Sequence, residues 1–143
     1  MSGEFVDTNV LIYAYDPTNA VKHALAQSLL ERLWADRAGR ISVQVMQEFF
    51  NISTKKIPSP LLPDQSLAIL RQLANWPVYS PGPEDVFAAV ELTKRASVSF
   101  WDAMILVAAH GSGSKTLWTE DLNDGESVLE VEVHNPFRDA EDR

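Results

Sequence analysis

The chain has 143 residues, of which 45% are hydrophobic and 22% charged, so it is long enough to bury the core of one globular domain. It contains no cysteine, which excludes disulfide bonds and zinc–thiolate sites. No apolar run could span a bilayer and the first residues do not resemble a signal peptide, so we expect a cytoplasmic protein with no membrane contact. The net charge of −8 argues against a basic nucleic-acid-binding face, unless bound cations offset some of the carboxylates.

The elements predicted along the chain alternate between strands and helices. In chain order we expect a strand at 5–6, a helical turn at 10–15, a helix at 20–38, a strand at 40–42, helices at 43–56 and 63–75, a strand at 76–79, helices at about 84–95 and 99–110, and strands at 115–119 and 129–133. Gly39 is a natural stop for the second helix, and Ser42 is a natural cap for the third. This alternation predicts an α/β domain with a mainly parallel sheet of about five strands. We assign residues 1–138 to the single domain and residues 139–143 to a polar tail.

Four acidic residues stand next to apolar residues or at the edge of an apolar run. Asp7 follows the first predicted strand and Asp121 follows the fourth, so both lie at the carboxyl edge of the sheet, where ligands bind in open parallel sheets. Asp102 is in the first turn of a helix, and Glu48 is about two turns into a helix that starts at the same edge. One cleft could therefore collect all four. Converging carboxylates without matching cations indicate a hard divalent ion such as Mg²⁺ or Mn²⁺.

Each of these acids also has an ordinary structural interpretation. Asp102 lies three residues after Ser99, as in a helix-capping pair, and taken singly capping is the more common role. Asp7 could cap the helix that follows it, Asp121 could belong to a turn, and Glu48 could lie on a solvated helix face. Four such residues at one sheet edge are less easily explained as four caps, so we favour the metal site.

Two competing motifs fit less well. Asp7-Thr8-Asn9 begins like the nucleophilic loop of haloacid-dehalogenase-type phosphatases, but that chemistry needs an acid two residues on, and Asn9 cannot supply a proton. The segment from Gly111 to Thr116 hints at a phosphate loop, yet it lacks the second glycine and precedes a strand instead of following one. We interpret it as a helix stop.

Candidate contacts with nucleic acid are few. Basic residues available for phosphate are Lys55-Lys56, Lys94-Arg95 and Lys115. The tryptophans are interpreted as core residues rather than as platforms for base stacking. They are Trp34, Trp76, Trp101 and Trp118.

Taken together, these motifs resemble those of PIN domains, specifically the VapC-like ribonuclease toxins of type II toxin–antitoxin pairs. The resemblance covers nearly the whole chain and rests on the order and spacing of five segments. They are Asp7-Thr8-Asn9-Val10-Leu11, Gln47-Glu48-Phe49, Ser99-Phe100-Trp101-Asp102-Ala103, Leu117-Trp118-Thr119-Glu120-Asp121-Leu122 and Asn135-Pro136-Phe137.

The resemblance implies a three-layer α/β/α fold with an acidic, Mg²⁺- or Mn²⁺-dependent site that cleaves RNA. The acids carried over are Asp7, Glu48, Asp102 and Asp121, with Glu120 and Asp124 as alternatives for the last position. Thr8 and Thr119 would be hydroxyl neighbours, and Asn9 is a further accessory position. The resemblance also implies a homodimer and a small antitoxin partner whose C-terminal segment occupies the cleft.

The physical logic of such a site starts from the mutual repulsion of its carboxylates, which divalent ions remove. A metal-bound water loses a proton more readily and attacks the phosphorus in line, while the metal stabilises the departing oxygen. We assign Asp7 as the central ligand, with Asp102 and Asp121 completing the shell; Glu48 has two open roles, coordination or positioning of the water. Two rival functions remain: a PIN-like scaffold that binds RNA or protein without cutting it, and a metal-dependent phosphatase.

Overall fold

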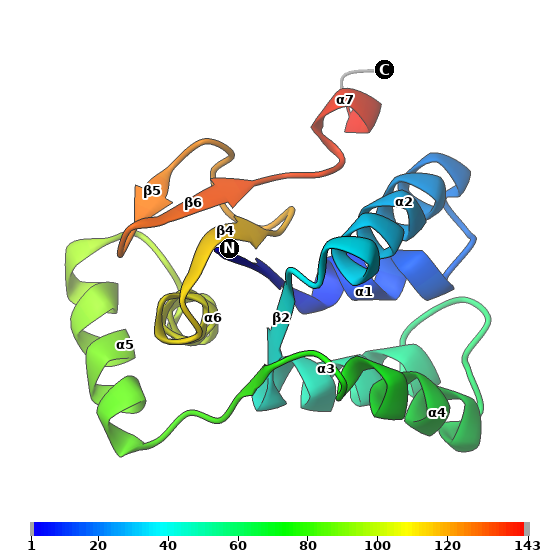
Figure 1. Ribbon diagram of the computed structural model, residues 1–143, viewed down its shortest axis with the longest axis horizontal. Helices are drawn as coiled ribbons and strands as arrows, with labels where there is room; N and C mark the ends of the chain where they lie inside the picture. The colour runs from blue at the N-terminus through cyan, green and yellow to red at the C-terminus, as the bar shows by residue number, and fades with distance from the viewer. Residues whose placement is uncertain (1, 142–143) are drawn as a thin grey trace.

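The computed structural model describes residues 2–141, and its strands form one sheet (Figure 1). The strand order is β3-β2-β1-β4-β6-β5, and every neighbouring pair is parallel except β5 and β6. The predicted α/β class with a mainly parallel sheet is confirmed, with six strands instead of about five. The strands are β1 (Gly3–Val6), β2 (Gly39–Ser42), β3 (Val78–Tyr79), β4 (Ser114–Trp118), β5 (Ser127–Val128) and β6 (Val131–His134).

Helices cover both faces of this sheet. The helices α1 and α2 pack against each other on one side, whereas α5 and α6 lie on the other, as Figure 1 shows. The most buried is α6, whose residues from Ala103 to Ala109 are all in the core. No helix within residues 2–141 has both the length and the apolar character needed to cross a membrane. The helices are α1 (Thr8–Tyr15), α2 (Ala20–Asp36), α3 (Val43–Lys55), α4 (Pro63–Leu73), α5 (Pro83–Arg95), α6 (Phe100–Gly111) and α7 (Arg138–Glu141).

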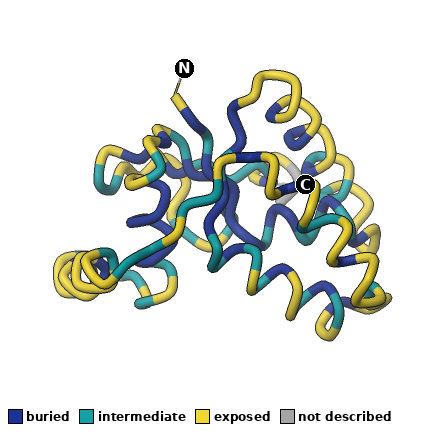
Figure 2. The backbone as a smooth tube through the Cα atoms, turned by 60° about the horizontal axis from the view of Figure 1, so that its bottom comes forward, coloured by how far each residue is buried: buried dark blue, intermediate teal, exposed yellow. Residues whose placement is uncertain are grey.

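The topology brings two strand ends together at the centre of the sheet. From β1 the chain moves outward to β2 and β3, and it then returns to the other side of β1 to form β4. The strand order therefore reverses between β1 and β4, which is where open α/β sheets bind their ligands. Figure 2 shows that the buried backbone runs through this central region, while the outer turns of the helices are exposed. Asp7 follows β1 and Thr119 follows β4 at this point.

Side-chain caps start the helices that carry two of the candidate acids. Ser42 is the last residue of β2, and its hydroxyl accepts a hydrogen bond from the backbone N–H of Val45 at 3.3 Å. This confirms the predicted cap and places the start of α3 at the carboxyl end of β2. Ser99 caps α6 in the same way, accepting from the N–H of Asp102 at 3.1 Å. Both helices therefore begin beside the edge where β1 and β4 end.

The end of α2 differs from the prediction. The helix stops at Asp36 because Arg37 adopts a left-handed conformation, with φ of 53°, and its N–H bonds back to the last turn. Gly39 is not the helix stop but the first residue of β2. A Cβ built there would lie 2.5 Å from the indole of Trp76, which is 5% exposed and packs on Trp34 with ring centroids 5.0 Å apart. Gly39 therefore permits a close approach between β2 and Trp76.

This approach predicts that Gly39→Ala destabilises the fold. Forcing a methyl group against a buried indole costs about 1–3 kcal/mol in the free energy of unfolding, because the ring and β2 must separate. Urea denaturation measures that cost. Gly82→Ser is the matched control, since a Cβ at Gly82 meets no atom within 4 Å. Equal stability of the two variants would contradict the close-packing argument.

The last part of the sheet also corrects the prediction. The single strand expected at 129–133 is instead a tight hairpin, in which β5 and β6 pair antiparallel and Val128 faces Val131. The two turn residues, Leu129 and Glu130, have φ values of 51° and 63°. Such hairpin turns usually carry asparagine or glycine, so Leu129-Glu130 gave no turn signal. The helix α7 overlaps the polar tail that we expect at residues 139–143. Residues 142 and 143 of that tail lie outside the described residues, and the domain bounds stay a prediction.

Candidate functional site

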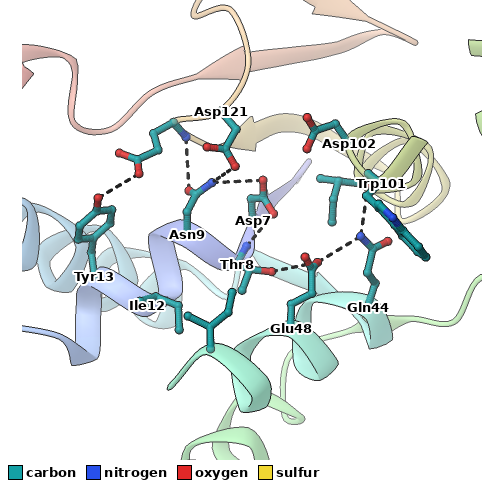
Figure 3. Close-up of a pocket in the computed structure, with 13 residues that line it drawn as sticks. Asp7, Thr8, Asn9, Ile12, Tyr13, Gln44, Glu48, Trp101, Asp102 and Asp121 are labelled. Carbon is teal, nitrogen blue, oxygen red and sulfur yellow. Dashed lines mark hydrogen bonds between the residues drawn. The ribbon is translucent and has the colours of Figure 1, made fainter. Parts of the chain in front are cut away.

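A cavity of about 230 Å³ opens at the switch point between β1 and β4 (Figure 3). Its walls come from four regions: the start of α1, one face of α3, the first turns of α6 and the loop after β4. All four acids that the sequence singled out line this cavity. The lining residues are Asp7, Thr8, Asn9, Ile12, Tyr13, Gln44, Glu48, Ile52, Trp101, Asp102, Ile105, Glu120 and Asp121.

Asp7 is the most deeply placed of the acids, with only 6% of its surface exposed. One carboxylate oxygen accepts from the backbone N–H of Thr8 at 2.7 Å, so Asp7 caps α1. The other accepts from the hydroxyl of Thr119 at 2.9 Å. The pKa of Asp7 is raised to about 7, chiefly by burial; the nearby carboxylates of Asp121 and Glu48 add to the rise, and the two hydrogen bonds oppose it. Asp7 thus combines capping with a strongly perturbed carboxylate.

The side chain of Asn9 bridges Asp7 and Asp121. Its amide nitrogen donates to the carboxylate of Asp121 at 2.9 Å and to the Thr119 hydroxyl at 3.2 Å, and it lies 3.5 Å from Asp7. The carbonyl of the same amide accepts from the backbone N–H of Glu120 at 3.4 Å. Asn9 therefore holds the loop after β4 against the start of α1. Its position explains why an amide fits here better than the carboxylic acid of a phosphatase loop.

Glu48 reaches the cavity from α3 and is half-buried. Its carboxylate accepts from the amide of Gln44 at 3.1 Å and from the hydroxyl of Thr8 at 3.4 Å. Burial raises the pKa of Glu48, and the carboxylates of Asp102 and Asp121 add to that rise. Glu48 is thus oriented by two neutral donors and faces other acids across the cavity.

Asp102 lies on the opposite wall, in the first turn of α6. The capping interpretation is correct for Ser99, whose hydroxyl accepts from the backbone N–H of Asp102. Asp102 nevertheless lines the cavity, so the cap and the site are compatible. Burial raises the pKa of the Asp102 carboxyl, and Asp121 raises it further.

The two alternative acids of the β4 loop have other partners. Glu120 accepts from the hydroxyl of Tyr13 at 3.0 Å and forms an ion pair with Lys22 at 2.9 Å. Asp124 is not part of the cavity lining. It accepts from the backbone N–H of Asn135 at 2.7 Å and pairs with Arg138 at 2.7 Å, and these contacts lower its pKa, the Asn135 bond most strongly. Among the three acids of this loop, Asp121 is therefore the one whose hydrogen bonds lead to the other candidate acids, through Asn9 to Asp7.

Sequence reasoning missed one prominent residue of the site. Trp101 is 64% exposed and stands at the edge of the cavity, so its interpretation as a core residue was wrong. The pattern offered a signal: Trp101 precedes Asp102 in the first turn of α6, where neighbouring residues point in different directions. The basic residues proposed for phosphate contact are likewise absent from the lining, which contains no lysine or arginine among the described residues.

A protein-family model described as PIN domain matches residues 5–123. The chain belongs to the PIN-domain family. This confirms the family suggested by the motifs, and the match spans β1 through the loop that carries Asp121. No curated protein matches the sequence significantly.

Solved structures of toxin–antitoxin proteins share the fold of this PIN domain. A toxin–antitoxin complex from Klebsiella pneumoniae has 19% identity and a TM-score of 0.68, covering 94% of this chain and 98% of that one. DNA-bound VapBC from Salmonella typhimurium has 19% identity and a TM-score of 0.66, with 95% and 99% covered. The toxin VapC20 from Mycobacterium tuberculosis, which cleaves the sarcin–ricin loop, has 18% identity and a TM-score of 0.60, with 80% and 87% covered.

The donor chemistry of this PIN-domain cavity suits a divalent cation. Its charged side chains are all carboxylates, and the pKa values of three of them are raised, first by burial and then by the neighbouring carboxylates. Oxygen-only donors of this kind fit Mg²⁺ or Mn²⁺. Within the described residues, however, no three acids stand close enough to hold one ion together. Asp7, Asp121 and Glu48 are instead each held by a hydrogen bond from a neutral side chain, namely Thr119, Asn9 and Gln44.

Proposed function

We propose that this PIN domain is a Mg²⁺- or Mn²⁺-dependent endoribonuclease that acts as the toxin of a toxin–antitoxin pair. The observation that carries the proposal is the meeting of Asp7, Glu48, Asp102 and Asp121 in one cavity at the topological switch point of the sheet. Burial and the neighbouring carboxylates raise the pKa values of Asp7, Glu48 and Asp102, which supports a site where a bound cation would stabilise the ionised forms. Perturbed acids in such a cleft are typical of catalytic sites.

The roles of the individual residues follow from their contacts. Asp7, Asp102 and Asp121 would hold the ion, which when bound supplies an activated water and charge for the departing oxygen. Thr119 and the N–H of Thr8 fix the orientation of the Asp7 carboxylate. Glu48 is held by two neutral donors, so it is able to accept a proton or to coordinate. The chain thus supplies ligands and their orientation rather than a nucleophile of its own.

The proposed partners follow from the structural relatives. Two of them are toxin–antitoxin complexes, and VapC20 is a toxin that cleaves the sarcin–ricin loop. By extension we propose that this chain forms a homodimer in the cytoplasm, pairs with a small antitoxin and acts on RNA. Chromatography with the product of a neighbouring reading frame tests the pairing, since a stable complex is expected.

Cleavage of total cellular RNA by the purified protein tests the activity. With Mg²⁺ or Mn²⁺ we expect discrete RNAs to be cut, and we expect EDTA and Asp7→Asn each to stop the reaction. Asp64→Asn, at an exposed position in the first turn of α4, is the matched control. Intact RNA with folded, antitoxin-free, metal-loaded protein would favour the binding scaffold. Turnover of a small phosphomonoester without RNA cleavage would favour the phosphatase.

The fourth acid can be assigned by comparing two neighbouring substitutions. Asp121→Asn is expected to lower kcat/KM for RNA about 10²-fold or more, because Asp121 faces the other acids. Glu120→Gln is expected to lower it less than about tenfold, because Glu120 is engaged by Lys22 and Tyr13. Steady-state kinetics on one RNA substrate measures both variants. A larger loss of kcat/KM for Glu120→Gln than for Asp121→Asn would identify Glu120 as the fourth ligand.

A further inference from the structure

An exposed tryptophan stands beside the acidic cavity without a partner for its outer surface. Trp101 is 64% exposed, among the highest values of any large apolar side chain described. It lines the cavity of the acids and also two adjoining hollows of about 350 Å³ and about 390 Å³. Figure 3 shows it with Gln44 at one edge of the site, next to Asp102. Trp101 therefore borders both the acidic cavity and the two hollows beside it.

The indole is supported from within. Phe100 packs edge-on against it, with ring centroids 5.1 Å apart and planes at 75°. Its backbone carbonyl accepts from the amide of Gln44 at 3.4 Å, and the same amide donates to Glu48. Gln44 thus links the backbone of Trp101 to a candidate acid. An aromatic ring that already packs on a neighbouring ring loses less side-chain entropy when another ring stacks on its outer face.

The hollow of about 350 Å³ next to Trp101 is lined by three side-chain amides of α3, two of which form no hydrogen bond in the part of the chain that the structure describes. Gln44, Gln47 and Asn51 recur on α3 at the spacing of one helix face, which they share with Glu48. Within the described residues, the side-chain amides of Gln47 and Asn51 form no hydrogen bond. Lys55 follows one turn after Asn51 on the same face and is exposed. Such a stripe offers both donors and acceptors, followed by one positive charge.

We propose that Trp101 and the amides of Gln47 and Asn51 form a subsite for one unpaired nucleobase of the RNA, adjacent to the scissile phosphate. This inference rests on the proposed ribonuclease function and adds a substrate class to it. A nucleobase has an aromatic face for the indole and an edge of donors and acceptors for the amides. A stacked base is inaccessible within a duplex, so the substrate is a single strand or a loop. Lys55 lies where the continuing backbone would pass.

Cleavage kinetics of three variants tests the subsite. The substrate is an unstructured mixed-sequence oligoribonucleotide with Mn²⁺, compared with the same strand in a duplex. Trp101→Ala is expected to raise KM roughly 10- to 100-fold with a smaller change in kcat, whereas Trp101→Phe keeps most of the affinity. The duplex is expected to be cut poorly by every variant. Phe87→Ala, at a 58%-exposed aromatic on α5 outside all three hollows, is the matched control and should leave both constants unchanged.

A binding measurement separates this inference from the proposed function. In the inactive Asp7→Asn background without metal, oligouridylate and oligoadenylate are expected to quench tryptophan fluorescence, and Trp101→Phe should abolish the quenching. If RNA is cut but Trp101→Ala has normal KM, or binding leaves the indole unquenched, the subsite is wrong and the ribonuclease stands. If Trp101→Ala changes the oligomeric state on size-exclusion chromatography and Trp101→Phe does not restore RNA affinity, Trp101 is a protein contact instead. Absence of both binding and cleavage overturns the proposed function and the subsite with it.

Discussion

Asp7→Asn is expected to remove RNA cleavage, by about 10³-fold or more, while making the metal-free protein more stable at neutral pH. In the proposed site Asp7 is the central ligand, and losing it would remove several kcal/mol of charge stabilisation from the transition state. The fold should survive, because an asparagine oxygen can still accept from the N–H of Thr8 and cap α1. Stability rises because the substitution removes a charge from a site that is 6% exposed.

The two effects must be measured on the same preparation. Cleavage of RNA with Mn²⁺ gives the first, and urea denaturation in EDTA at pH 7.5 gives the second. Asp64→Asn should change neither, since Asp64 is exposed and does not line the cavity. A variant that is inactive because it is unfolded would show no cooperative urea transition. Full activity in a folded Asp7→Asn protein would remove Asp7 from the site.

The metal-free protein is also expected to lose stability as the pH rises from about 4 to about 7. Burial raises the pKa of Asp7 from an ordinary value of 3.8 to about 7, so the folded state holds this proton more tightly than the unfolded chain does. The stabilisation is fully present below the unfolded pKa, and it disappears as the pH passes the folded pKa. For Asp7 alone this corresponds to about 4 kcal/mol.

Other carboxyls modify this pH profile in known directions. Glu48 and Asp102 have raised pKa values and add to the loss of stability above pH 4. Glu4 has a lowered pKa, first because of its hydrogen bond with Arg32, and Asp124 is lowered chiefly by the N–H of Asn135. These two stabilise the fold above their unfolded pKa values and act in the opposite sense. The difference between wild type and Asp7→Asn isolates the Asp7 contribution.

Urea denaturation of both proteins in EDTA, repeated between pH 4 and pH 8, measures that difference. Wild type should lose stability relative to Asp7→Asn across this interval. Saturating Mn²⁺ at pH 7.5 should restore wild type, because a ligand that binds the folded state alone stabilises it, and should do far less for Asp7→Asn. A constant difference at all pH values would mean that Asp7 is ionised at its ordinary pKa, which contradicts the burial argument.

Much of the site could be predicted because it depends on topology. Asp7 and Asp121 follow strands that the apolar pattern reveals, and parallel strands bring their carboxyl ends to one edge. The position of Glu48 could be predicted from Ser42, because the cap that Ser42 forms fixes where α3 begins. The position of Asp102 could be predicted in the same way from Ser99, which caps α6. Local signals were sufficient for these elements because caps and strand ends act within a few residues.

Other features depend on contacts that no local pattern records. The hairpin after β5 uses Leu129 and Glu130 in left-handed conformations, which neither residue type favours. The direction of the Trp101 side chain depends on how α6 packs against the sheet, and this packing leaves the indole 64% exposed. The engagement of Glu120 with Lys22 joins positions 98 residues apart. Such choices are settled by tertiary packing.

The loop that carries Asp121 is fastened on both sides of that residue. On one side Glu120 is tied to α1 and α2 through Tyr13 and Lys22, and on the other Asp124 is tied to Asn135 and Arg138. Asp121 thus lies between two residues whose contacts hold the loop in place. The second of these, Asp124, is held by residues near the C-terminal end of the fold. A fused tag or a truncation near Arg138 is therefore expected to weaken this second contact and, with it, the position of Asp121 in the acidic cavity.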